Sequence, residues 1–189
     1  MTETHYDGYF FNDNETTGLY PDKHGINEIA CIRTDLDFNI KEYWRSYVKP
    51  APQIIWTTEA SEVSGIVKET VNGEPEELQI ANTILAMATG RGRLRYAGFN
   101  CKFDLPMISA LSTRTIRREF GFVMPWLCLL EVARKQLPDL PPVWNDKWKK
   151  NQTHTLELVC KHLGIDISGA HGAAFDIYAT VQVARKLMR

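Results

Sequence analysis

Residues 8–18 read Gly-Tyr-Phe-Phe-Asn-Asp-Asn-Glu-Thr-Thr-Gly, and the interpretation of the whole chain starts from this stretch. Its aromatic beginning is typical of a strand, so we expect a strand over Gly8–Asn12 that runs into the acidic residues. Asp13 and Glu15 are two positions apart, which on a strand places both carboxylates on one face of the sheet. Two carboxylates held together are costly to ionise without a cation. The stretch therefore indicates a divalent metal site.

Thr16, Thr17 and Gly18 follow the acid pair and are expected to turn the chain. Glycine permits a positive φ or the close approach of a ligand, so we expect one of these two at Gly18. Backbone amides at such a strand end can hold the sugar-phosphate that a metal binds. A polar turn with solvated acids is the alternative interpretation of the same residues.

Two more acidic positions and a histidine follow later in the chain. Asp104 comes after an expected strand, and we place it at a strand-to-helix junction where helix-end amides can orient it. His171 precedes Asp176 by five residues, which places the imidazole on a loop before the last helix. From there it could reach a water held by a metal that Asp176 ligates. A helix-capping aspartate and a surface histidine are the alternatives.

The composition is that of an ordinary globular protein. The chain has 189 residues, 44% of them hydrophobic, and a net charge of −1, which argues against a non-specific nucleic-acid coat. We expect one domain over residues 1–189. The four cysteines form no Cys-x-x-Cys pair, so reduced thiols are favoured over disulfides and no structural zinc is expected. Neither a signal peptide nor a long apolar span is visible, which predicts a cytoplasmic protein with no membrane partner.

The hydrophobic pattern changes period along the chain. Three strands, Gly8–Asn12, Glu28–Thr34 and Phe38–Val48, have short connections that suggest an antiparallel meander. Helices and strands then alternate. The expected elements are helices at 59–64, 76–89, 102–111, 130–136, 155–163 and 173–188, and strands at 94–99 and from 123. Residues 138–153 are expected to form a loop. This order predicts an α/β fold with a central mixed five-stranded sheet flanked by helices.

Taken together, the acidic motifs resemble those of the DEDDh-type (DnaQ-like) 3′–5′ exonucleases of the ribonuclease H-like superfamily. The first motif, Asp-x-Glu-Thr-Thr-Gly, corresponds to Asp13–Gly18. The second, Asn-x-x-Phe-Asp, corresponds to Asn100–Asp104, and the third, His-x-Ala-x-x-Asp, to His171–Asp176. The resemblance covers nearly the whole chain and implies a ribonuclease H-like fold.

The resemblance also implies a two-metal hydrolysis that uses Mg²⁺ or Mn²⁺. Asp13 would bridge both ions, Glu15 and Asp176 would complete the site of the attacking water, and Asp104 would serve the second ion. His171 would be the general base. The products would be nucleoside 5′-monophosphates. The residues expected to contact the 3′-terminal nucleotide are Thr16, Thr17, Gly18, Leu19, Asn100 and Phe103, although Phe103 also suits a core position.

Two departures from the family leave substrate preference open, because Phe99 and Ser64 stand where relatives often have histidine. Basic and aromatic residues interleave in the long loop, which suits single strands. These residues are Trp144, Lys147, Trp148, Lys149 and Lys150. Two arginine clusters, at 91–95 and 114–118, could serve nucleic acid or simply be solvated.

The expected partners are single-stranded 3′ ends, with DNA slightly preferred over RNA. An RNA-trimming exoribonuclease and a catalytically inactive nucleic-acid-binding or polymerase-associated module are the alternatives. The chain ends at Arg189, directly after the last expected helix, which favours a free-standing nuclease over a polymerase-tethered one. A polymerase partner stays possible, and the sequence leaves the oligomeric state open.

Overall fold

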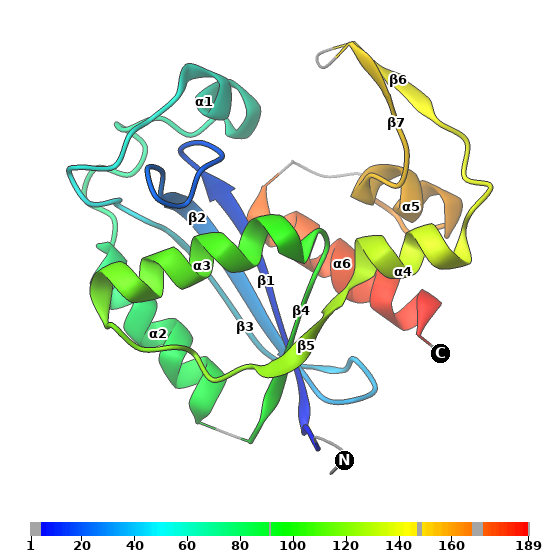
Figure 1. Cartoon of the computed structure of the whole chain (residues 1–189), viewed down its shortest axis with the longest axis horizontal. Helices are drawn as coiled ribbons and strands as arrows, with labels where there is room; N and C mark the ends of the chain where they lie inside the picture. Colours follow the sequence, from blue (N-terminus) through cyan, green and yellow to red (C-terminus); the bar gives the residue numbers. More distant parts are fainter. Residues whose placement is uncertain (1–4, 91, 147–148, 168–171, 189) are drawn as a thin grey trace.

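The computed structural model describes residues 5–90, 92–146, 149–167 and 172–188. Its centre is a five-stranded sheet in the order β3-β2-β1-β4-β5 (Figure 1). The first three strands form the expected antiparallel meander, and β4 and β5 run parallel to β1. The mixed sheet is therefore confirmed. The strands are β1 (Gly8–Thr16), β2 (Ile26–Thr34), β3 (Ile40–Tyr47), β4 (Leu94–Gly98) and β5 (Val123–Cys128).

Helices cover both faces of this sheet. The helices of the described residues are α1 (Thr58–Ser64), α2 (Glu77–Thr89), α3 (Cys101–Thr115), α4 (Leu129–Gln136), α5 (Leu156–His162) and α6 (Ala173–Leu187), and α1 buries no residue. Figure 1 shows α2 and α3 on one side and α4, α5 and α6 on the other. None of the helices in the described ranges is long and apolar enough to cross a membrane.

The alternation of side chains along β1 explains why helices cover both faces. Phe10 packs in the core under α2 and α3, whereas Tyr9 and Phe11 pack in the core under α5 and α6. All three aromatic side chains are buried, so β1 is covered on both sides. The same alternation sends Asp13 and Glu15 toward α6, and Asn12 and Asn14 toward α3.

Several element boundaries differ from the sequence expectation. β1 continues four residues beyond Asn12, because its pairing with β2 extends past Glu15 opposite Glu28 to Thr16 opposite Ile26. The acid pair is therefore part of the strand. β3 begins later than expected, since Phe38 has a left-handed backbone (φ 62°) in the turn that precedes it.

The expected loop at 138–153 is wrong in one respect. It contains a hairpin of two short strands, β6 (Val143–Asn145) and β7 (Lys150–Gln152), which form a separate sheet. Each strand has only three residues and all six are at least partly exposed, so no hydrophobic alternation marked them.

Candidate active site

Three carboxylates meet at the end of β1. Asp13 and Glu15 come from β1, and Asp176 comes from the first turn of α6. One oxygen of each lies within 4.8 Å of the others, close enough for a single cation to contact all three. The two-residue spacing on β1 and the packing of α6 on this face bring them together.

Asp104 approaches the same place from the opposite face of the sheet. It lies in the first turn of α3, and only 4% of its surface is exposed. The side-chain amide of Asn14 donates to Asp104 Oδ1 over 3.3 Å and to its carbonyl oxygen over 3.4 Å. α3 follows β4, which is parallel to β1, so both strands deliver their acids to one edge of the sheet.

Asn14 belongs to a hydrogen-bonded chain that the sequence analysis missed. Tyr96 donates to Asn12 Oδ1 over 2.8 Å, and the Asn12 amide donates to Asn14 Oδ1 over 2.7 Å. All three side chains are buried. The alternation Asn-x-Asn beside Asp-x-Glu on one strand was the available signal. These hydrogen bonds orient the side chain of Asn14, which in turn orients the carboxylate of Asp104.

The electrostatics of the cluster favour a bound cation. Burial raises the pKa of Asp13 well above its ordinary value, and the charges of Asp104 and Asp176 raise it further. Burial raises the pKa of Glu15 to about 7, with help from the charge of Glu28, and raises that of Asp104 to about 8. A cation would offset this repulsion, and hard carboxylate oxygens suit Mg²⁺ or Mn²⁺.

A hollow of about 360 Å³ opens beside Glu15. Its lining includes Thr16, Leu19 and Phe103, and Leu19 is 67% exposed. Most of the other lining residues come from the turn after β1 and from α1, which are Gly18, Tyr20, His24, Thr57, Glu59, Ala60 and Val63. An apolar hollow directly beside a carboxylate cluster can hold a flat ring while a neighbouring phosphate reaches the acids.

The comparisons with known proteins agree with this geometry. An exonuclease family model, RNase_T, matches residues 10–184. The chain belongs to this exonuclease family. The DEDDh-type resemblance and the ribonuclease H-like fold are thereby confirmed.

Two relatives and one solved structure illustrate the similarity. Exodeoxyribonuclease I of Escherichia coli is 29% identical over 191 residues, which span 94% of this chain and 39% of the relative. A PolC-type DNA polymerase III of Oceanobacillus iheyensis is 27% identical over 183 residues, 97% of this chain but 12% of the polymerase. The structure of Escherichia coli exonuclease I in complex with a dT13 oligonucleotide superposes with a TM-score of 0.79 at 27% identity. It covers 95% of this chain and 40% of that one.

Two residues of the first motif, Thr17 and Gly18, have contacts that the sequence analysis did not predict. An ideal Cβ at Gly18 would lie 2.5 Å from the ring of His24, and the backbone there has no positive φ. The close approach of His24 therefore requires glycine here, and the alternative of a positive φ is wrong. Thr17 is fully buried, and its hydroxyl donates to the carbonyl oxygen of Ile55 over 2.7 Å.

The backbone of Thr17 is also engaged within the protein. Its N–H donates to the carbonyl oxygen of Gly25 over 2.9 Å, and its carbonyl oxygen accepts from the N–H of Thr57 over 2.9 Å. Thr17 therefore holds the turn together and does not line the hollow. Asn100 is exposed, outside the lining, and takes a left-handed conformation (φ 68°) before α3, which asparagine tolerates well.

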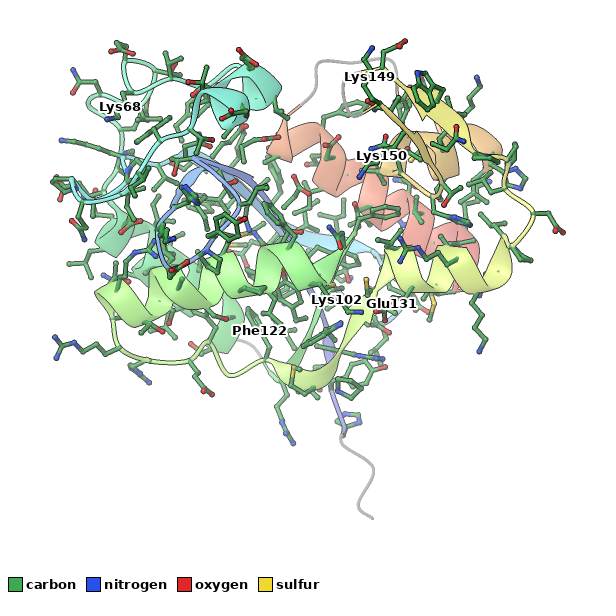
Figure 2. All side chains as sticks on the ribbon, turned by 45° about the horizontal axis from the view of Figure 1, so that its top comes forward. Lys68, Lys102, Phe122, Glu131, Lys149 and Lys150 are labelled. Atoms are coloured by element: carbon green, nitrogen blue, oxygen red, sulfur yellow. The ribbon has the colours of Figure 1, made fainter. Side chains whose placement is uncertain are left out.

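Some of the basic residues considered for nucleic-acid binding make contacts within the protein. Arg95 donates to the Pro125 carbonyl, and Arg114 pairs with Glu77 over 2.8 Å. Lys149 and Lys150 lie together on the β6–β7 hairpin, where Trp144 is 53% exposed (Figure 2). Figure 2 also labels Lys102, which pairs with Glu131 over 3.0 Å and ties the start of α3 to α4. His171, Arg91, Lys147 and Trp148 lie outside the described residues.

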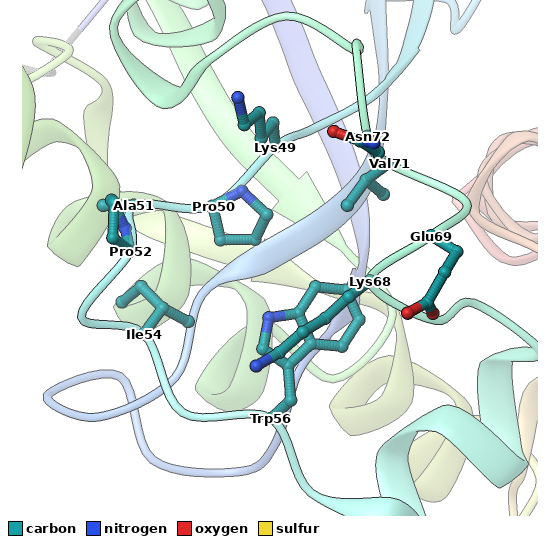
Figure 3. A pocket seen from close by; sticks show the side chains of 10 residues that line it. All are labelled: Lys49, Pro50, Ala51, Pro52, Ile54, Trp56, Lys68, Glu69, Val71 and Asn72. Atoms are coloured by element: carbon teal, nitrogen blue, oxygen red, sulfur yellow. The ribbon is translucent and has the colours of Figure 1, made fainter.

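A second hollow, of about 310 Å³, is lined by the segment between β3 and α1 and by residues that follow α1 (Figure 3). Trp56, Lys49 and Lys68 line it, together with one acidic residue, Glu69. Because a single carboxylate cannot form the oxygen cage that a divalent ion needs, this hollow is not a second metal centre.

The raised pKa values predict how the stability of the metal-free protein depends on pH. As pH rises above about 4.5, the ordinary value of glutamate, the unfolded chain loses protons that folded Glu15 keeps up to about pH 7. The free energy of unfolding should therefore fall between about pH 4.5 and 7, by about 3 kcal/mol for Glu15.

Thermal melting in chelator at a series of pH values measures this effect. The melting temperature should fall across that window and recover when Mn²⁺ is added at pH 8. The matched variant Glu15→Gln should flatten the pH dependence. A wild-type melting temperature that rises over the same window would contradict the assigned pKa shifts.

Proposed function

We propose that this chain is a metal-dependent 3′–5′ exonuclease that releases nucleoside 5′-monophosphates from single-stranded ends, with DNA preferred over RNA. The observation that carries the proposal is the meeting of Asp13, Glu15 and Asp176 within 4.8 Å beside an apolar hollow. The chain spans 39% of exodeoxyribonuclease I and 12% of PolC, so the activity of those whole proteins is not transferred.

In this mechanism the side chains of the protein would hold the metal ions and accept the proton of the attacking water. Asp13, Glu15 and Asp176 would hold one ion, and Asp13 with Asp104 a second. Two divalent ions, when bound, supply an activated water and stabilise charge on the leaving 3′ oxygen. His171, two residues before α6, would accept the proton of the water, for which its imidazole must be neutral.

The hollow beside Glu15 supports cleavage at the end of a strand, because it could hold the terminal base. Leu19 and Phe103 would hold the terminal base, while Thr16 and Gly18 line the same space near Glu15. Base stacking on apolar side chains tolerates any sequence, as a general exonuclease requires. Lys149 and Lys150 on the hairpin would meet phosphates further along the strand.

The relatives support a preference for DNA and suggest a second candidate function. Exodeoxyribonuclease I is a DNA enzyme by name, and its similar structure contains dT13. The similarity to a stretch of a PolC-type polymerase supports proofreading beside a DNA polymerase as the second candidate.

One experiment tests the reaction, its direction and its substrate together. Oligonucleotides labelled at the 5′ end are incubated with the full chain in Mg²⁺, in Mn²⁺ and in chelator. Single-stranded DNA should give a ladder of shortened products with either ion, faster than single-stranded RNA, and chelator should abolish it. Release of the label as a mononucleotide at the outset, or cleavage in chelator, would contradict the proposal. A duplex with a mispaired 3′ end tests proofreading, which predicts faster removal of that end than of a paired one.

A further inference from the structure

Glu28 is a fifth carboxylate beside the metal-binding acids. It lies on β2 directly opposite Glu15 on β1, and only 3% of its surface is exposed. Its charge is the largest charge contribution to the raised pKa of Glu15. A carboxylate that weakens its neighbour's ionisation is unfavourable at this position unless it has another use.

Two contacts show how Glu28 is held and what it holds. Arg45 on β3 donates to Glu28 Oε1 from both Nε and Nη2, which compensates the buried charge. The other oxygen, Oε2, accepts from the backbone N–H of Ala173 over 3.4 Å. The carboxylate thus connects the sheet to the first residue of α6.

The start of α6 has no side-chain cap of its own. Its N-cap residue is Gly172, which cannot donate or accept through a side chain. Gly172 has a φ of 150°, a backbone conformation that favours glycine, and an ideal Cβ there would be in ordinary contact with Glu28 Oε2 at 3.5 Å. A carboxylate at a helix N-terminus satisfies a free amide and interacts favourably with the helix dipole.

This connection leads directly to a metal-binding acid. The Asp176 amide donates to the Gly172 carbonyl over 3.1 Å in the first turn of α6. We propose that Glu28, clamped by Arg45, is a positioning residue that fixes the start of α6 and thereby holds Asp176 against Asp13 and Glu15. The inference rests on the proposed function, in which Asp176 binds a cation.

Two conservative variants separate the reach of Glu28 from its charge. Glu28→Gln loses the charge but keeps the length of the side chain, and its single acceptor oxygen can face either Arg45 or Ala173 but not both. Glu28→Asp keeps the charge but is one methylene shorter and cannot span the gap. If position matters, Glu28→Asp should be damaging although it preserves the net charge of the site.

The expected effects are on Mn²⁺ binding and kcat rather than on the binding of the substrate. Glu28→Asp should weaken Mn²⁺ binding and lower kcat by about 10-fold or more, and Glu28→Gln should do the same because it can make only one of the two contacts. The KM for single-stranded DNA should change less than about 2-fold in both, because neither Glu28 nor Ala173 lines the hollow beside Glu15. Glu42→Ala is the matched control, since Arg33 and Glu42 form a similar pair between β2 and β3 over 3.3 Å.

Calorimetric titration with Mn²⁺ and cleavage of labelled single-stranded DNA measure these quantities, with melting curves to verify folding. A loss in Glu28→Gln but not in Glu28→Asp would overturn the inference, since charge would then be the cause. Wild-type Mn²⁺ affinity in Glu28→Asp would also overturn it. If wild-type protein shortened no DNA, the proposed function would fail, while the titration would still report whether Glu28 positions the metal site.

Discussion

Asp13→Asn should lower the rate of single-strand cleavage by about 10³-fold or more, equivalent to about 4 kcal/mol of transition-state stabilisation. Asp13 is the central acid of the cluster, because its pKa is raised by the charges of Asp104, Asp176, Glu15 and Glu28, in that order. Asparagine keeps the size of the side chain but removes the charge that two cations would share.

The same substitution should have the opposite effect on the stability of the metal-free protein. Removing one buried carboxylate relieves the repulsion in the cluster, so the melting temperature in chelator should rise while activity is lost. Asp139→Asn, an exposed aspartate after α4, is the control and should change neither quantity. Loss of activity together with a lower melting temperature would point to a folding defect, and retained activity would remove Asp13 from the mechanism.

His171→Ala should lower kcat by about 10²- to 10⁴-fold, the usual contribution of a positioned general base. The assignment comes from the third motif of the sequence. Wild-type kcat should rise with pH through the histidine pKa, about 6.5 in unperturbed peptides, because only neutral imidazole accepts a proton.

Single-turnover cleavage between pH 5.5 and 8.5 distinguishes a base from a structural histidine. His171→Ala should lose the rise with pH but bind Mn²⁺ with wild-type affinity. His162→Ala, an exposed histidine at the end of α5, should keep both the rate and its pH dependence. A His171→Ala enzyme with near-normal turnover would leave the reaction without its assigned base.

Local patterns predicted much of this molecule correctly. The aromatic run before Asp13 and the apolar face at 76–89 identified a strand and a helix, because buried faces impose their period on the sequence. The spacing of Asp13 and Glu15 predicted their common face, since adjacent side chains of one strand alternate. The three-residue strands of the hairpin were missed because they bury too little to leave such a pattern.

What the sequence by itself determined was the order of elements, the family, and the residue types that could hold a cation. Only the tertiary structure decided that Glu28 lies opposite Glu15, that Asn14 orients Asp104, and that Gly18 makes room for His24. The physical reason is the distance along the sequence that separates the interacting residues. A periodicity constrains neighbours along one strand or helix, whereas contacts between elements depend on strand register and helix packing, which every buried side chain in the core sets together.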